Sequence, residues 1–244
     1  MFWKEKSVKK MNLEKTIKKI EAGLKEYAGN RKAIIGISGG IDSAVVAGLC
    51  TRALGKENIY GILMPYGNQN TECARLVVDY LRIANQEINI KNIVDSFNFL
   101  KLNKLSKGNI MARMRMIILY GFANEFKGLV VGTGNKSECE VGYFTKYGDG
   151  GVDLQPIADL YKTEIFEVAK ILGLPKKIVE KIPSADLYEG QTDEGEIGAT
   201  YKEIDAVLKG KIKKGRVYEK IQARRIATEH KRKMPLIIKV KEEK

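Results

Sequence analysis

The chain has 244 residues, with 43 Lys and Arg against 30 Asp and Glu and a formal net charge of +13. Its length and its 44% apolar content allow one substantial buried core, which excludes a wholly disordered protein. No apolar run approaches the ~20 residues of a membrane-spanning helix, so we expect no membrane partner. The first residues are charged where a secretory signal would be apolar, and the three cysteines form no paired motif. We therefore expect a cytoplasmic protein with reduced thiols.

The positive charge is concentrated at the two ends of the chain. Residues 1–25 hold eight lysines against three glutamates, and residues 207–244 hold fourteen Lys or Arg against four glutamates. The body between them is nearly neutral, with a net charge of −2. We interpret the excess as solvated charge and expect no nucleic-acid partner. No repeat or linker divides the chain, so we predict a single domain over 1–244 with basic, flexible ends at 1–11 and 236–244.

Apolar periodicity predicts strands that alternate with helices over the first half of the chain. Strands are expected at 33–37, 59–64, 88–94 and 129–132. Helices are expected between them at 12–28, 42–54, 71–85 and 110–126. The strand signal is weak after Gly151, and three further helices are expected at 160–172, 200–209 and 216–232. This order predicts an α/β fold with a parallel sheet covered by helices on both faces and a helical C-terminal part.

The first predicted strand leads into a helix through Ser38-Gly39-Gly40-Ile41-Asp42-Ser43. A glycine-rich turn at a helix N-terminus exposes N–H groups that suit a phosphate. The loop lacks the Gly-Lys-Ser/Thr of a phosphoryl-transferring P-loop, and it also lacks the dinucleotide pattern Gly-x-Gly-x-x-Gly. Asp42 would repel a phosphate unless a cation lay between them, which indicates Mg²⁺. The loop alone is equally compatible with a tight turn in which Asp42 caps the helix.

This loop resembles the pyrophosphate loop of the N-type ATP pyrophosphatases, which split ATP into AMP and pyrophosphate. Four further segments resemble one member of that group, the ammonia-dependent NAD synthetase family. They are Gly108–Met116, Gly132–Glu138, Gly142–Glu164 and Pro183-Ser184-Ala185-Asp186. The resemblance covers about residues 12–235 and implies a flavodoxin-like fold of the adenine nucleotide alpha hydrolase type.

The resemblance implies which residues bind ATP and which bind a metal ion. The implied ATP contacts are Gly36, Ile37, Ser38, Gly39, Gly40, Ile41, Asp42, Ser43, Thr133, Lys162 and Ser184. Mg²⁺ would bind to Asp42 and Glu138, because two carboxylates with substrate phosphates and water satisfy this ion. Without the resemblance, Glu138 would be interpreted as a surface carboxylate in a polar loop.

The resemblance assigns a second group of residues to the substrate deamido-NAD. These residues are Arg113, Lys146, Asp153, His230 and Lys231. Without it, His230 would be an ordinary surface histidine near a helix C-terminus, and the Met-rich helix around Arg113 would be core or dimer contact. Arg113 and Arg115 should point to different faces of that helix. The sequence departs from the family at Tyr188, where tryptophan is usual, and at Gln155, where asparagine is frequent.

The implied reaction is the ATP-dependent amidation of deamido-NAD (nicotinic acid adenine dinucleotide) to NAD, the last step of NAD biosynthesis. The substrate carboxylate attacks the α-phosphorus of ATP, which forms an NAD-adenylate and releases pyrophosphate. Free ammonia then displaces AMP, since we expect no glutaminase domain. No residue is assigned as a nucleophile or base. The resemblance also implies a homodimer.

Two other classes of function remain open. A tRNA-modifying ATP pyrophosphatase would use the basic ends on RNA, although neither paired cysteines nor an RNA-binding domain is visible. A nucleotide-binding regulator without turnover would have no need to combine Asp42, Glu138 and Lys162.

Overall fold

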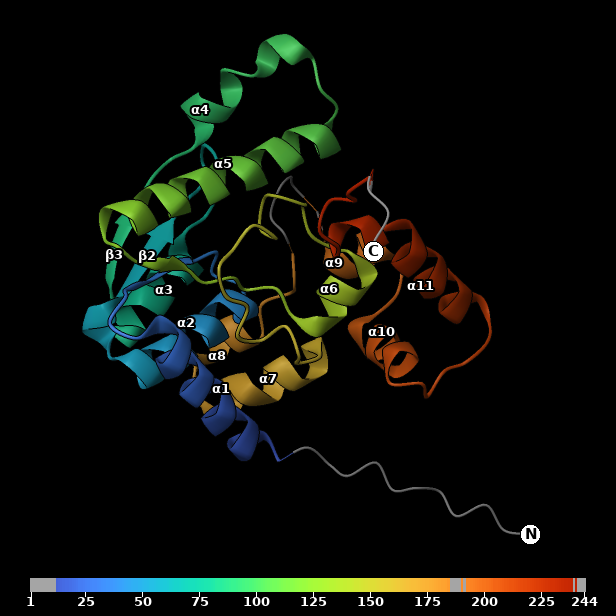
Figure 1. Ribbon diagram of the computed structural model, residues 1–244, viewed down its shortest axis with the longest axis horizontal. Helices are drawn as coiled ribbons and strands as arrows, with labels where there is room; N and C mark the ends of the chain where they lie inside the picture. Colours follow the sequence, from blue (N-terminus) through green and yellow to red (C-terminus); the bar gives the residue numbers. More distant parts are fainter. Residues whose placement is uncertain (1–11, 185–189, 191, 239, 241–244) are drawn as a thin grey trace.

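Four parallel strands form a sheet in the order β3-β2-β1-β4 (Figure 1). The computed structural model describes residues 12–184, 190, 192–238 and 240, and all structural statements concern these residues. The strands are β1 (Ala33–Gly36), β2 (Ile59–Leu63), β3 (Ala84–Glu87) and β4 (Leu129–Val130). β1 lies between β2 and β4, with Ala33 opposite both Ile59 and Leu129.

Helices connect the strands and continue after the last one. Those of the first half are α1 (Leu13–Ala28), α2 (Ile41–Leu54), α3 (Glu72–Leu81), α4 (Lys91–Asp95), α5 (Lys104–Glu125) and α6 (Lys136–Val141). Those of the second half are α7 (Lys162–Ile171), α8 (Lys176–Val179), α9 (Asp193–Ile197), α10 (Tyr201–Leu208) and α11 (Arg216–Ala227). Short 3-10 turns occur at η1 (Lys56–Asn58), η2 (Asn98–Leu100) and η3 (Glu229–Lys231). Within the described residues no helix is both long and apolar enough to cross a membrane.

The sheet separates two apolar cores, because successive strand residues point to opposite faces. Ile35 and Leu63 pack into the core formed with α1, α2, α3, α7 and α8. Ile34 and Ile62 pack into the other core, beneath α4 and α5. Figure 1 shows α5 on one side of the sheet and α1 and α7 on the other. The prediction of an α/β fold with helices on both faces is therefore confirmed.

The helical C-terminal part has an apolar cluster of its own. Buried Val141, Ile197, Ile204 and Ile221 join α6, α9, α10 and α11 in this cluster. These helices lie to one side of the sheet (Figure 1), and α10 contacts both α6 and α7. Residues of α10 consequently reach the edge of the sheet where β1 and β4 end.

The prediction of a third strand at 88–94 is wrong. The strand is Ala84–Glu87, and residues 91–95 form α4. β3 is a polar edge strand with all four residues exposed, so it lacks the apolar pattern of a buried strand. Ile90 and Val94 are buried from a turn and a helix against α5. The helix predicted at 71–85 ends earlier, at Leu81.

Candidate active site

The predicted ATP contacts from Gly36 to Ser43 span the end of β1, the loop at residues 37–40 and the first turn of α2, which begins at Ile41. Gly39 has a φ of +76°, and a Cβ atom there would lie 2.6 Å from the backbone nitrogen of Ala74. The Ser38 and Ser43 hydroxyls are 3.1 Å apart, and the Gly40 N–H donates to Ser38 Oγ at 3.2 Å. This close packing against the start of α3 gives the loop a defined shape.

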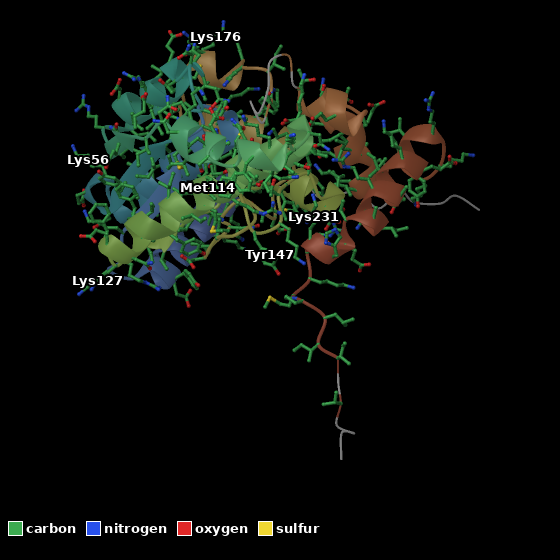
Figure 2. The ribbon with its side chains drawn as sticks, turned by 90° about the horizontal axis from the view of Figure 1, so that it is seen from above. Lys56, Met114, Lys127, Tyr147, Lys176 and Lys231 are labelled. Carbon is green, nitrogen blue, oxygen red and sulfur yellow. The ribbon has the colours of Figure 1, made fainter. Side chains whose placement is uncertain are left out.

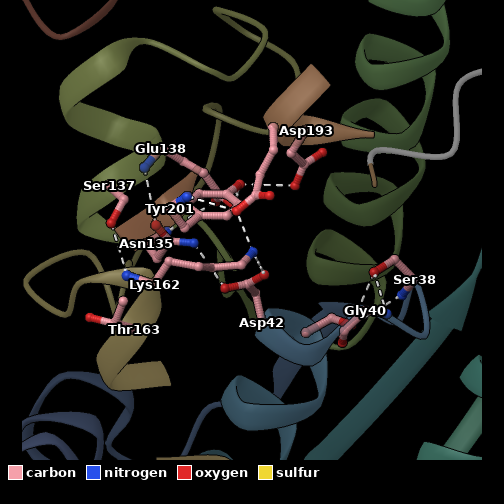
Figure 3. A network of polar contacts seen from close by, with 12 residues as sticks. Ser38, Gly40, Asp42, Asn135, Ser137, Glu138, Lys162, Thr163, Asp193 and Tyr201 are labelled. Atoms are coloured by element: carbon pink, nitrogen blue, oxygen red, sulfur yellow. Dashed lines mark hydrogen bonds and ion pairs between the residues drawn. The ribbon is translucent and has the colours of Figure 1, made fainter. Parts of the chain in front are cut away.

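Gly40 is the N-cap of α2, and no side chain caps this helix. The interpretation of Asp42 as the capping residue is therefore wrong. Asp42 lies in the first turn, and its side chain points toward α7 instead of folding back on the helix (Figure 3). The first N–H groups of α2 have no side-chain cap, so they are available to an anion.

Asp42 and Glu138 converge on one ammonium group (Figure 3). Lys162 Nζ lies 2.5 Å from Asp42 Oδ2 and 2.9 Å from Glu138 Oε1. The lysine side chain is only 2% exposed, whereas the two carboxylates are 16% and 15% exposed. Glu138 and Lys162 each belong to the first turn of a helix, α6 and α7. The fold thus brings three predicted site residues from three elements to one point at the carboxyl edge of the sheet.

Asn135 fixes this pair of carboxylates, although it was absent from the predicted site. Its Nδ2 donates to Asp42 Oδ1 at 2.9 Å, and its Oδ1 accepts from the Glu138 N–H at 3.0 Å. Glu138 in turn accepts from the Asn135 N–H at 3.4 Å, which completes a capping box at the start of α6. The pattern Asn-x-x-Glu is a known helix-start signal and could have predicted this contact from the sequence.

Four more residues missed in the sequence support the site from the helical part. The Tyr201 hydroxyl lies 3.1 Å from Glu138 Oε1 and 2.9 Å from Asp193 Oδ2. The start of α7 is held by Ser137, whose Oγ accepts from the Lys162 N–H at 2.8 Å and donates to Asp205. Asp205 is itself buried and accepts from the Thr163 N–H. Such contacts join residues far apart in the sequence, and no local pattern predicts them.

The electrostatics of the site favour an additional cation. Burial raises the pKa of Glu138 to about 7, an effect that Lys162 opposes and Asp42 reinforces. Burial alone would lower the pKa of Lys162, but Asp42 and Glu138 outweigh it and the pKa is raised. The single ammonium of Lys162 thus faces two carboxylates, and the three groups together retain an excess of negative charge. The oxygen donors of Asp42 and Glu138 suit Mg²⁺.

No cluster of three or more His, Cys, Asp or Glu side chains suitable for a metal ion occurs in the described part of the chain. A magnesium ion at Asp42 and Glu138 would therefore need substrate phosphates and water as its other ligands, which is usual for this ion.

The residues predicted to bind the dinucleotide form a second group around the loop at 142–153. Arg113 donates to the carbonyl of Lys146 at 3.2 Å, and Lys146 Nζ donates to the carbonyl of His230 at 2.7 Å. Lys231 Nζ donates to the carbonyls of Gly142 and Phe144. Figure 2 labels Lys231 and, on the same side of the view, Tyr147 of this loop. The structure brings these four predicted residues together. Helix α6 links the two groups, because it contains Glu138 of the first group and ends at Val141, directly before the loop at 142–153.

The remaining predicted contacts are distributed more widely. Asp153 is exposed and accepts from the Val130 N–H and the Tyr120 hydroxyl, at 2.8 and 3.1 Å. Thr133 is half-buried just after β4, and Ser184 is half-buried before the segment 185–189. The residues Ala185, Asp186 and Tyr188 lie outside the described residues. All of the basic end at 1–11 also lies outside them, and so do residues 239 and 241–244 of the basic end at 236–244.

Arg113 and Arg115 point to different faces of α5, as predicted. Arg113 is exposed beside the loop at 142–153, whereas Arg115 donates to the carbonyl of Met64 at 3.1 Å. Gln155, a departure from the family pattern, accepts a long hydrogen bond from Cys139 Sγ at 3.8 Å.

The fold and the site define a nucleotide-binding α/β protein whose anion loop and carboxylate pair lie at the carboxyl edge of a parallel sheet. A family model described as NAD synthase matches residues 12–244. The chain belongs to this family, and the resemblance seen in the sequence is confirmed.

Named relatives agree with this assignment. The chain is 50% identical over 205 residues to the NH3-dependent NAD(+) synthetase of Pyrococcus furiosus, covering 82% of this chain and 79% of the relative. It is 44% identical to the enzyme of that name from Archaeoglobus fulgidus, over 95% of this chain and 99% of the relative.

Two solved structures are close to this one. NMN synthetase from Francisella tularensis has a TM-score of 0.89 at 36% identity, over 94% of this chain and 99% of that one. NH3-dependent NAD synthetase from Campylobacter jejuni has a TM-score of 0.79 at 34% identity, over 94% of this chain and 100% of that one.

Proposed function

We propose that the protein is an ammonia-dependent NAD synthetase that converts deamido-NAD to NAD with ATP. One observation carries this proposal: Lys162 contacts Asp42 and Glu138 together, beside an uncapped helix N-terminus after a glycine loop. That arrangement provides positive charge and a cation site for the pyrophosphate part of ATP. Membership of the NAD synthase family supports amidation as the reaction.

The residues of the first group would position ATP for attack on its α-phosphorus. The N–H groups at the start of α2 would bind the pyrophosphate, and the Ser38 and Ser43 hydroxyls would donate to it. Mg²⁺ held by Asp42 and Glu138 would neutralise phosphate charge. Lys162 supplies a further cation at the same point. Because the substrate carboxylate is itself the nucleophile, the protein needs only to orient the reactants and stabilise charge.

The residues of the second group would bind deamido-NAD. Arg113 and Lys146 are cations at the edge of the loop at 142–153, and His230 and Lys231 close it from the C-terminal side. A guanidinium group suits an anionic phosphate or carboxylate. Asp153 would accept a hydrogen bond from the substrate. We further propose that the enzyme is a cytoplasmic homodimer that takes free ammonia directly.

The test is a reaction with ATP, Mg²⁺, ammonium and deamido-NAD, followed by chromatography of the products. We expect NAD, AMP and pyrophosphate in equal amounts. Folded protein that makes no NAD contradicts the proposal. AMP formed only in the presence of tRNA would instead indicate a tRNA-modifying pyrophosphatase, and binding of ATP without any cleavage would indicate a regulator.

A second substrate deserves the same assay because of the similarity to NMN synthetase from Francisella tularensis. By its name, that relative makes the mononucleotide, so the corresponding deamido substrate here would be nicotinate mononucleotide. The enzymes named NH3-dependent NAD(+) synthetase from Pyrococcus furiosus and Archaeoglobus fulgidus have higher sequence identity, 50% and 44%, which favours deamido-NAD. We expect a higher kcat/KM for deamido-NAD, and a higher value for nicotinate mononucleotide would reverse the assignment.

The metal site has its own test. Asp42→Asn and Glu138→Gln should each reduce turnover and raise the Mg²⁺ concentration needed for half-maximal activity, because each removes one charged oxygen ligand. Asp159→Asn is the matched control, since its side chain is 96% exposed and forms an ion pair with Lys136 at the surface. Near-normal rates and Mg²⁺ dependence in both site variants would exclude these two residues as metal ligands.

A further inference from the structure

We propose that Tyr201 is a positioning residue for the metal-binding carboxylate of Glu138, and that Asp193 orients Tyr201. The inference rests on the proposed function, in which Asp42 and Glu138 hold a divalent cation. It concerns a different part of the molecule, because Tyr201 and Asp193 belong to α10 and α9 of the helical C-terminal part.

The first argument is the place of the tyrosine hydroxyl. It lies 3.1 Å from Glu138 Oε1 and 2.9 Å from Asp193 Oδ2, between two carboxylates (Figure 3). A tyrosine hydroxyl has one hydrogen, so it donates to one of these carboxylates at a time. The carboxylates of Glu138 and Asp193 therefore share a single donor. A change in the hydrogen bond to one carboxylate alters the hydrogen bond to the other.

The second argument is that Tyr201 contacts both charged partners of the site. Its ring centroid is 4.8 Å from Lys162 Nζ, and the same oxygen of Glu138 that contacts this ammonium lies beside the hydroxyl. Tyr201 is only 4% exposed, so packing in the apolar cluster of the helical part fixes its ring. A rigid ring with a hydroxyl at the carboxylate is suited to holding Glu138 in one orientation.

The third argument comes from Asp193. This carboxylate is 4% exposed, and its Oδ1 has no hydrogen-bond partner among the described residues. Its Oδ2 accepts from Tyr201 at 2.9 Å. A buried carboxylate is costly unless it is compensated. A role in orienting the tyrosine hydroxyl accounts for an acidic group at this place, next to a site that already has excess negative charge.

The test measures cation binding directly, as well as activity. Mn²⁺ is titrated into the full-length protein with an ATP analogue that has a methylene group between the α- and β-phosphorus atoms, and free Mn²⁺ is read by electron paramagnetic resonance. Removal of a partner that orients a metal ligand typically weakens metal binding 10- to 100-fold. We expect Tyr201→Phe to weaken Mn²⁺ binding about tenfold. The Mg²⁺ concentration for half-maximal activity should rise by a similar factor, with a smaller change in kcat at saturating Mg²⁺.

Tyr201→Phe keeps the ring and its contact with Lys162 but removes the donor to the buried Asp193, so the protein should unfold at a lower temperature, and its folding is checked before Mn²⁺ is titrated. Tyr218→Phe is the matched control, because Tyr218 packs against the same apolar cluster and has no contact with Glu138. Unchanged Mn²⁺ affinity in folded Tyr201→Phe would overturn the inference. Should that variant fail to fold, Asp193→Asn serves in its place, with weaker Mn²⁺ binding expected and unchanged affinity as the contrary result.

A double-mutant cycle separates positioning from simple charge. If Asp193 acts through Tyr201, the effect of Asp193→Asn on Mn²⁺ binding should be much smaller in the Tyr201→Phe background. Additive effects would mean that Asp193 acts on the cation only through its charge, and would refute the orienting role. Wild-type protein that neither binds Mn²⁺ with the analogue nor makes NAD would refute the proposed function itself, whereas failure of the variants alone would refute only this inference.

Discussion

Lys162 is unusual for a lysine, because its side chain is only 2% exposed. A buried lysine is rare unless it is paired, and here Asp42 and Glu138 both contact the ammonium. Two carboxylates and one cation leave excess negative charge in a region of low dielectric. Burial raises the pKa of Glu138, an effect that Lys162 opposes and Asp42 reinforces, whereas Asp42 and Glu138 together outweigh the burial of Lys162 and raise its pKa.

The raised pKa of Glu138 predicts a pH-dependent stability. Its pKa is 4.5 in the unfolded reference and about 7 in the fold. Between these values the folded protein binds more protons than the unfolded chain, so the contribution of Glu138 is greatest below 4.5 and is lost as the pH rises through about 7. Glu138→Gln does not titrate. Its free energy of unfolding should therefore fall less over this range than that of the wild type.

Urea unfolding of the metal-free protein at several pH values measures this difference. The relevant quantity is the free energy of unfolding of the wild type minus that of Glu138→Gln, since other titrating groups cancel in it. The matched control is Glu140→Gln, on the same helix and paired with Arg225 at the surface. Equal slopes for wild type and Glu138→Gln would show that the pKa of Glu138 is not raised.

At the residue scale, the sequence predicted the three charged residues of the site but not the residues that hold them in place. Asp42, Glu138 and Lys162 belong to motifs that are continuous in sequence, so resemblance could identify them. Tyr201 contacts Glu138, which lies 63 residues earlier in the sequence, and Asp193 is linked to Glu138 through the Tyr201 hydroxyl. Such contacts depend on how α10 packs against α6, which no local pattern specifies. Asn135 is intermediate, because its capping box is a local pattern that could have been used.

At the scale of elements, the loop between β1 and α2 depends on its contact with α3. A Cβ atom at Gly39 would lie 2.6 Å from the Ala74 nitrogen and 2.9 Å from Cys73 Cβ, and the backbone φ of +76° disfavours a side chain. Gly39→Ala should therefore displace the loop, at a cost of roughly 1–3 kcal/mol in the free energy of unfolding. A misplaced anion loop should reduce NAD formation roughly a hundredfold.

Gly23→Ala is the matched control for this prediction, because nothing lies within 4 Å of the added atom in the middle of α1. Alanine there should stabilise the helix by about 0.5–1 kcal/mol and leave NAD formation unchanged. Thermal unfolding and the NAD assay on both variants provide the measurement. A fully active Gly39→Ala variant would indicate that the loop does not bind the phosphates of ATP.

The misplaced third strand shows where element prediction from this sequence fails. Apolar residues at Ile88, Ile90 and Val94 favoured a strand, yet these side chains enter the core from a turn and from α4. The true strand, Ala84–Glu87, is polar because it has only β2 as a neighbour and both of its faces are exposed. Buried strands such as β1 and β2 were predicted well because both faces of the sheet impose apolar residues on them.

At the scale of the whole molecule, the site lies where the sheet and the helical C-terminal part meet. The loop at β1 and the carboxylate of Asp42 come from the sheet side, and Tyr201 comes from α10. Most of the excess positive charge belongs to the ends of the sequence. In the proposed function the site would bind anions through a few placed cations and N–H groups, and the net charge of +13 says little about its ligands.

The proposed homodimer predicts a self-association surface on α5. Met111 of this helix is buried in the core, whereas Ile117 on its outer side is 54% exposed. Tyr147 is also 54% exposed, and its neighbour Lys146 accepts a hydrogen bond from Arg113, one helical turn before Ile117. Exposed apolar side chains mark protein–protein interfaces, and Arg113 on the same helix is a proposed contact to deamido-NAD, so such an interface would lie beside the proposed substrate site.

Ile117→Glu should therefore weaken the dimer. A buried, unpaired carboxylate costs at least about 3 kcal/mol, which corresponds to roughly hundredfold weaker association. Sedimentation at several protein concentrations measures the change. Ile226→Glu on α11 is the matched control, because Ile226 is 75% exposed and lies on another helix. Since Arg113 lies on the same helix as Ile117, the dissociated protein should also have a higher KM for deamido-NAD. An intact dimer in Ile117→Glu would place the interface elsewhere.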